Sequence, residues 1–335
     1  MTTWPWPAGA ATGIGSLPGD DIVEATKFVL GELVDLPHLP ELPARGAGAD
    51  MIGRGAGFLT ELPVELYAGT WRVAAHPGLD LRRTRDLLER DLDVLTEATI
   101  GYTGPLKVQA AGPWTLAASL DLPIGGRLLH DHGAVRDLVA SLAEGLRAHV
   151  AEVARRVPGA SVLLQLDEPS VPAVLAGRVP TESGLRTLRS VPSSTVRSTL
   201  ATIVDAVSAP VIVHCCASGA PLRLFREAGA AAVAIDLTLV GASAAAHDEL
   251  GELLDAGLGL LAGAVPTSGP PAPSSAAAAD AVTALWRRLG FPLEPLPSQV
   301  VVTPACGLAG AAPGYARAAL AACVEAGHRL RDPVS

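Results

Sequence analysis

Short apolar runs bounded by glycine or proline recur along the chain, most clearly in its second half. Val, Leu, Ile and Ala fill these runs without alternating with polar residues, which is typical of strands buried on both faces of a parallel sheet. Two weaker runs lie near the N-terminus, and prolines interrupt the second of them. The predicted strands are residues 11–15, 37–42, 106–110, 161–166, 210–214, 231–236, 257–265 and 299–303.

Longer amphipathic stretches lie between these runs. Within residues 134–157, Val135, Leu138 and Leu142 recur at the spacing of one helix face, and Pro158 follows directly as a stop signal. The same pattern predicts helices over residues 20–33, 84–98, 198–207, 244–254, 275–289 and 313–326.

This alternation predicts an α/β fold, a single TIM (β/α)8 barrel domain over residues 1–335, because such a barrel needs about eight strand–helix units. A doubly wound open sheet is the alternative. Against it, Gly15 is followed by Ser16-Leu17-Pro18 and not by the third glycine of a phosphate-binding loop. The Pro- and Gly-rich segments 36–57 and 266–275 are predicted to be loops.

Composition narrows the class of partner. The formal net charge is −9 and only two of the 25 basic residues are lysines, Lys27 and Lys107, so no basic stripe is available for nucleic acid. The longest apolar stretches, such as 258–265, are too short to cross a membrane, and the N-terminus lacks the pattern of a signal peptide. We therefore expect a cytoplasmic protein without nucleic-acid or membrane partners, in which the cysteines are free thiols or metal ligands.

The segment VIVHCCASG indicates a metal site. His214 and Cys216 follow an apolar strand and lie two residues apart, so they point to the same side, while Cys215 points away. Cys306 follows another strand, and in a barrel both strand ends lie on the rim where active sites are built. One imidazole and two thiolates are a typical zinc set, and Asp236, at the end of the strand AAVAID, is the predicted fourth, exchangeable ligand.

Each residue alone has a simpler interpretation. A single buried cysteine is usually a small apolar side chain, and a single histidine is usually structural. Cys323, on the apolar side of the last helix, is predicted to be such a core residue. The convergence of three strand ends favours the metal.

Two further segments place polar groups at strand ends. LLQLDEPSV ends in Asp167 and Glu168, which could bind a substrate ammonium or a cation, or form a salt bridge to an arginine. In TGIGSLPG, Gly15 allows close approach of a ligand to the backbone, and Ser16 offers a hydroxyl and an amide to a carboxylate.

In this order and spacing, the segments resemble the C-terminal catalytic barrel of cobalamin-independent methionine synthase, in the superfamily that also includes uroporphyrinogen decarboxylase. The resemblance covers nearly the whole chain. It is carried by Ile14-Gly15-Ser16, Asp50-Met51, GPWT at 112–115, Asp167-Glu168-Pro169, His214-Cys215-Cys216 and Cys306-Gly307-Leu308.

The resemblance implies a zinc-dependent S-methyltransferase that methylates homocysteine to methionine. The methyl donor that it implies is methyltetrahydrofolate or a corrinoid, free or carried by a partner corrinoid protein. Zn2+ is then bound by His214, Cys216, Cys306 and, in place of the family's glutamate, Asp236. The substrates are held by Ile14, Gly15, Ser16, Trp114, Asp167 and Glu168.

The chain also departs from the family. It has no room for the additional N-terminal barrel of the full-length enzyme. The proton-donating histidine falls near Ser268 and the folate-stacking tryptophan near Ser119, while two expected acids fall at Ala47 and Ala173. The residues expected to bind zinc are thus nearly all present, whereas several of those expected to bind the methyl donor are missing. No catalytic acid or base is assigned. A uroporphyrinogen-decarboxylase-like lyase and a non-catalytic zinc- or ligand-binding barrel are the alternatives.

Overall fold

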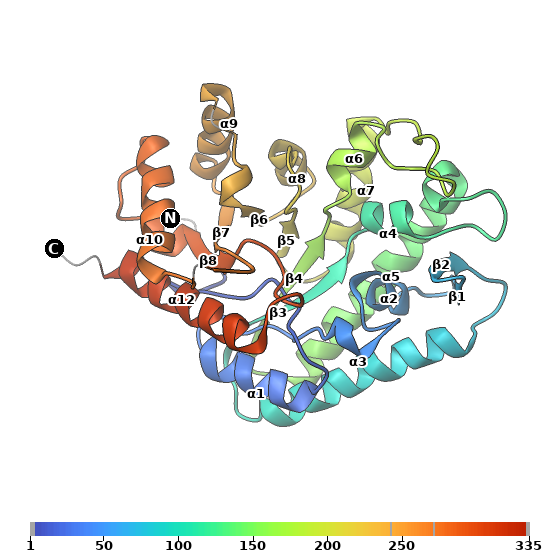
Figure 1. Ribbon diagram of the computed structural model, residues 1–335, viewed down its shortest axis with the longest axis horizontal. Coiled ribbons are helices and arrows are strands. Elements are labelled where there is room, and N and C mark those ends of the chain that lie inside the picture. Colours follow the sequence, from blue (N-terminus) through green and yellow to red (C-terminus); the bar gives the residue numbers. More distant parts are fainter. Residues whose placement is uncertain (1–3, 242, 271, 333–335) are drawn as a thin grey trace.

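A computed structural model describes residues 4–241, 243–270 and 272–332. A curled sheet of six parallel strands, each hydrogen-bonded to the next in chain order, forms its centre (Figure 1). An antiparallel hairpin of β1 (Val64–Tyr67) and β2 (Thr70–Val73) lies apart from it. The strands of the main sheet are β3 (Gly104–Ala111), β4 (Ala160–Asp167), β5 (Val211–His214), β6 (Ala232–Asp236), β7 (Gly259–Val265) and β8 (Val300–Pro304).

Helices surround this sheet (Figure 1). None of them, in the described part of the chain, combines the length and the hydropathy that a membrane span requires. The helices are α1 (Ile22–Glu32), α2 (Met51–Gly57), α3 (Leu79–Ala98), α4 (Pro113–Ser119), α5 (His132–Arg156), α6 (Val171–Leu175), α7 (Ser193–Ala206), α8 (Leu222–Glu227), α9 (Ala244–Asp255), α10 (Ser275–Arg288), α11 (Leu296–Gln299) and α12 (Pro313–Arg331), with short 3-10 turns η1 (Pro43–Arg45), η2 (Leu128–His130) and η3 (Leu237–Leu239).

Local sequence explains where the long helices begin and end. The carboxylate of Asp131 accepts hydrogen bonds from the amides of Gly133 and Ala134, which caps α5, and Ser243 and Ser274 cap α9 and α10 in the same way. The predicted helices all occur, although α3 and α7 begin earlier than expected. The first turn of α7 is polar and carries no apolar signal, whereas that of α3 mixes leucines with charged residues.

The first two predicted strands differ from the structure. Residues 11–15, with the adjacent Ser16, and residues 37–42 contribute only isolated parallel bridges, at Ala11, Ser16, His38 and Glu41. Gly15 has a φ of 152°, and the prolines of the second segment cannot donate to a ladder, so regular pairing is interrupted. The structure thus shows an α/β fold with a six-stranded curled parallel sheet, and the complete eight-stranded barrel stays a prediction.

Several short elements were not predicted: the hairpin β1–β2, the helices α2, α4, α6, α8 and α11, and the 3-10 turns. The expected loop over residues 36–57 contains the short helix α2, whose N-cap Asp50 accepts hydrogen bonds from two backbone amides. The hairpin β1–β2 lies in a stretch for which no element was predicted, because its short strands carry charged residues on their half-buried faces.

Two apolar cores lie on opposite sides of the sheet. The larger one packs the sheet against the helices. The smaller one fills the inner, concave side and includes Trp6, Leu163, Ile212 and Val301. Near the C-terminal ends of the strands, the side chains on the inner side of the sheet are polar, and they form the candidate site.

Candidate metal centre

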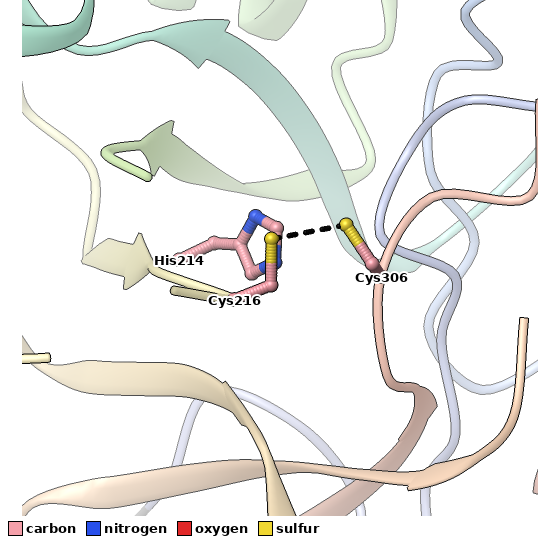
Figure 2. A group of neighbouring side chains, drawn as sticks. All are labelled: His214, Cys216 and Cys306. Atoms are coloured by element: carbon pink, nitrogen blue, oxygen red, sulfur yellow. Dashed lines mark hydrogen bonds between the residues drawn. The ribbon is translucent and has the colours of Figure 1, made fainter. Parts of the chain in front are cut away.

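His214, Cys216 and Cys306 meet at the C-terminal edge of the sheet (Figure 2). His214 is the last residue of β5, and Cys306 follows the end of β8 by two residues. One ligand atom from each of the three lies within 4.8 Å of the other two, and the two sulfur atoms are 3.1 Å apart. His214 is buried, whereas both cysteines are half-buried, so the group is open on the side of the sulfurs.

The strand alternation explains which cysteines take part. Cys215 is 1% exposed and belongs to the outer core, and its amide donates to the carbonyl of Ala234. Cys323 is buried in the same outer core from α12. All four cysteines are free thiols, and only the two that were predicted to face the rim lie beside His214.

A carboxylate orients the imidazole. Asp167 is paired with His214 across β4 and β5, and its Oδ1 lies 2.7 Å from Nδ1 of the ring. A carboxylate accepts from Nδ1–H, so Nε2 is the nitrogen that can bind a metal once its own proton is lost. Nε2 is buried and has no hydrogen-bond partner among the described residues. This arrangement is typical of metal-binding histidines, whose second nitrogen is held by a carboxylate or carbonyl.

The pKa values show how strongly these groups interact. Burial lowers the pKa of His214, but the neighbouring Asp167 and Cys306 outweigh it and raise that pKa to about 9. The hydrogen bond with Cys216 lowers the pKa of Cys306 to about 4, against its burial and with help from His214. Of the two thiols, Cys306 therefore loses its proton more readily, and a metal ion at this place would replace the protons that the group otherwise shares.

Asp167 is itself held from the inner side of the sheet. Nε2 of Gln165 donates to Asp167 Oδ1 at 2.8 Å, and Nζ of Lys107 donates to Oε1 of Gln165 at 2.7 Å. Lys107 is fully buried, and its role was not predicted. The signal was present, since a lysine inside the apolar run PLKV is costly to bury without a purpose.

The segment Ile14-Gly15-Ser16 adjoins this group. Both Lys107 and Gln165 donate to the carbonyl of Ile14, at 3.0 and 2.8 Å. The amide of Leu308 donates to the carbonyl of Ser16 at 2.8 Å, and the Ser16 hydroxyl fills the space that a side chain at position 307 would need. The first and the last of the predicted segments are thus in contact next to Cys306.

The other predicted site residues make different contacts. Asp236 is not in the group of three, and its Oδ1 accepts from the amide and the hydroxyl of Thr238. Glu168 is fully buried, and both of its oxygens accept hydrogen bonds from the first residues of α4, Trp114 and Thr115. Trp114 is 1% exposed and donates its indole N–H to the carbonyl of Val196. Zinc ligation by Asp236 and substrate contact by Glu168 and Trp114 stay predictions.

A buried ion network lies behind the Ser16 segment and was also not predicted. Arg45 and Arg54 both bind the carboxylate of Asp91, and Nε of Arg54 lies 3.4 Å from Glu41. Glu41 is paired through its backbone with Ser16. Burial raises the pKa of Glu41 to about 7 although Arg54 opposes this, and Asp167 contributes in the same direction as burial.

A solved structure supports the fold. A B12-independent methionine synthase from Shewanella sp. W3-18-1, solved in complex with selenomethionine, superposes with a TM-score of 0.62 at 13% identity, covering 97% of this chain and 98% of that one. A GH113 beta-mannanase from Alicyclobacillus acidocaldarius superposes with a TM-score of 0.42 at 13% identity, covering 96% and 97% of the two chains. Among curated proteins, none matches the sequence significantly.

The family is shown by the sequence itself. Residues 95–329, more than half of the chain, match the family described as "Cobalamin-independent synthase, Catalytic domain". This range contains the three residues of the candidate metal centre as well as Asp167 and Asp236. The predicted enzyme class, an S-methyltransferase that acts on homocysteine, is confirmed at the level of the family, and the chain belongs to the cobalamin-independent synthase family through its catalytic domain.

Proposed function

We propose that this protein is a zinc-dependent methyltransferase that converts homocysteine to methionine, with the metal bound by Nε2 of His214 and the sulfurs of Cys216 and Cys306. The observation that carries the proposal is the convergence of these three atoms within 4.8 Å at one edge of the sheet. The donor set fits zinc, because one imidazole and two thiolates leave a position free for a substrate. When bound, zinc would favour the thiolate form of homocysteine at neutral pH.

The residues beside the group supply the contacts for an amino-acid substrate. Asp167 uses Oδ1 for Gln165 and His214, which leaves Oδ2 to accept hydrogen bonds from the substrate ammonium. The hydroxyl of Ser16 lies next to Gly307 and is suited to the substrate carboxylate. Held at both ends, the substrate would present its sulfur to the open side of the cysteines, in position for in-line attack on a methyl group.

The methyl donor in this proposal is a methyltetrahydrofolate. A family described as cobalamin-independent gives no reason to expect a corrinoid partner. Ser119, at the place of the family's folate-stacking tryptophan, lines a cavity of about 460 Å3 together with Trp71, Asp50 and Arg127. An indole, a carboxylate and a guanidinium are groups that a pterin can stack on and hydrogen-bond to.

We also propose that residues 1–335 form one closed eight-stranded barrel in the cytoplasm. The isolated bridges support closure, because Ala11 pairs with β8, Ser16 with Glu41, and His38 with β3, so these segments occupy the places of two strands between β8 and β3. A reducing compartment would keep Cys216 and Cys306 as thiols.

The test is metal analysis of the purified protein, followed by titration with homocysteine and by methyl-transfer assays with methyltetrahydrofolate. We expect one zinc per chain, release of a proton on thiol binding, and formation of methionine. Rescue of a methionine auxotroph by the wild-type gene, but not by Cys306→Ser, would support the same conclusion, with Cys323→Ala as the control outside the site. Metal-free protein that binds no thiol would rule the proposal out.

A further inference from the structure

Lys107 brings an amino group to the inner side of the sheet, and the proposed reaction gives it no direct use. Its side chain is fully buried, and it forms no salt bridge among the described residues. Nζ donates instead to Oε1 of Gln165 at 2.7 Å, to the carbonyl of Ile14 at 3.0 Å, and to Oε1 of Gln109 at 3.3 Å. A charge that is buried at this cost points to a positional role.

The ammonium determines the orientation of the Gln165 amide. A lysine ammonium has only donors, so the oxygen of Gln165 must face it and the NH2 group must face the other way. That NH2 group donates to the carbonyl of Ile14 and to Oδ1 of Asp167, both at 2.8 Å. If the amide were turned round, two donors would meet at Lys107 and two acceptors at Asp167.

Asp167 connects the Gln165 amide to the imidazole of His214. Its Oδ1, fixed by Gln165, lies 2.7 Å from Nδ1 of His214, which keeps the tautomer with Nε2 free. The chain of contacts thus runs from β3 through β4 to β5, where Gln109 pairs with Gln165 and Asp167 pairs with His214. Through the carbonyl of Ile14, the same ammonium also holds the backbone next to Ser16.

We propose that Lys107 is a positioning residue that sets the geometry of His214 through Gln165 and Asp167, and at the same time anchors the Ile14-Gly15-Ser16 segment that binds the substrate. The inference rests on the proposed zinc site and adds a residue to it that touches neither metal nor substrate. Through these contacts, the one buried lysine positions both the metal-binding residues and the residues that bind the amino acid.

The test compares Lys107→Met with Lys27→Met, since Lys27 is the other lysine of the chain and is exposed in an ion pair with Glu24. Cobalt-substituted proteins report the ligand geometry through their visible absorption, and competition with a chelator gives the zinc affinity. We expect Lys107→Met to shift the cobalt spectrum, to weaken zinc by about tenfold, and to raise the KM for homocysteine more than it lowers kcat. Lys27→Met should match the wild type in all three.

A second variant keeps the test decisive if Lys107→Met folds poorly. Gln165→Met should reproduce the spectral shift, and the double variant should weaken zinc no more than Gln165→Met alone, because for the metal site both changes break one chain of contacts. An unchanged cobalt spectrum and an unchanged zinc affinity in Gln165→Met or in a folded Lys107→Met would overturn the inference, with the zinc site intact. Wild-type protein that binds neither cobalt nor zinc would instead contradict the proposed function.

Discussion

The two sides of the candidate site are built in different ways. His214, Cys216 and Cys306 lie at the ends of β5 and β8, strands that form ladders with their neighbours, with one register shift between Gly263 and Val265 of β7. Ser16 and Glu41, on the other side, belong to segments that make only isolated bridges.

Different interactions hold these two sides. The sheet ladder and the apolar inner core position the metal side. Buried charges position the substrate side, through Lys107 on the carbonyl of Ile14 and through Arg54 on Glu41. Removing a metal-side residue should therefore abolish methyl transfer and leave the free energy of unfolding nearly unchanged. Removing a substrate-side charge should mainly lower the free energy of unfolding.

The largest effect is expected from Cys216→Ala. Loss of one of two thiolate ligands should reduce bound zinc to a small fraction of one per chain and lower the rate of methyl transfer by about a thousandfold, on the order of 4 kcal/mol. The free energy of unfolding of the metal-free protein should change little, because Cys216 is half-buried. Metal content, initial rates and urea unfolding measure the three quantities.

Cys215→Ala is the matched control, one residue away and facing the outer core. We expect it to keep its zinc and its rate and to lose about 1 kcal/mol of stability from the lost packing. Equal zinc content in the two variants would contradict the assignment of the metal side.

The next effect concerns the substrate side. Asp91→Ala leaves Arg45 and Arg54 without their shared carboxylate in a buried place, which should lower the free energy of unfolding by about 3 kcal/mol. Glu65→Ala, which breaks the half-exposed pair with Arg72, should cost less than about 1 kcal/mol. If urea unfolding gave the two variants the same loss, the buried network would not be what holds this side.

The same contrast explains what the sequence could predict. The apolar runs of β4 to β8 predicted both the strands and the edge at which His214, Cys216 and Cys306 meet, because a parallel strand buried on both faces has an unambiguous pattern. The spacing of Cys215 and Cys216 even separated the core cysteine from the rim cysteine.

The substrate side could not be predicted in this way. Its segments are rich in Gly and Pro and form no ladder, so their position follows from side-chain contacts between residues far apart in the chain. Arg54 meets Asp91 and Lys107 meets Gln165 only after folding, and no local pattern specifies either pair. The hydrogen bond from the amide of Thr238 to Asp236 could not be predicted either, since a carboxylate at a strand end can bind a ligand or cap the next turn.

A smaller effect should appear in the pH dependence of stability. Burial lowers the pKa of Lys107 to about 7, although Asp167 and Glu41 oppose it, whereas the unfolded chain has an ordinary lysine pKa. Between these two values the unfolded state binds more protons, so stability should rise with pH. From pH 7 to pH 9 the stability of metal-free wild type should therefore rise by on the order of 2 kcal/mol relative to that of Lys107→Met, which lacks this titrating group. Parallel curves for the two proteins in urea unfolding would contradict the lowered pKa.

The smallest expected effect tests Asp236 on the metal side. If its carboxylate is the exchangeable ligand, Asp236→Ala should weaken zinc by about tenfold, near 1.4 kcal/mol, in the absence of substrate. At saturating homocysteine the difference should vanish, because the substrate thiol then occupies that position. Asp236→Asn separates this role from the cap of η3, since the amide oxygen can still accept from Thr238 while its affinity for zinc is poor. We expect the Asn variant to lose as much affinity as the Ala variant. An Asn variant with wild-type affinity would show that Asp236 only caps the turn, and that the zinc has three protein ligands, all from β5 and β8.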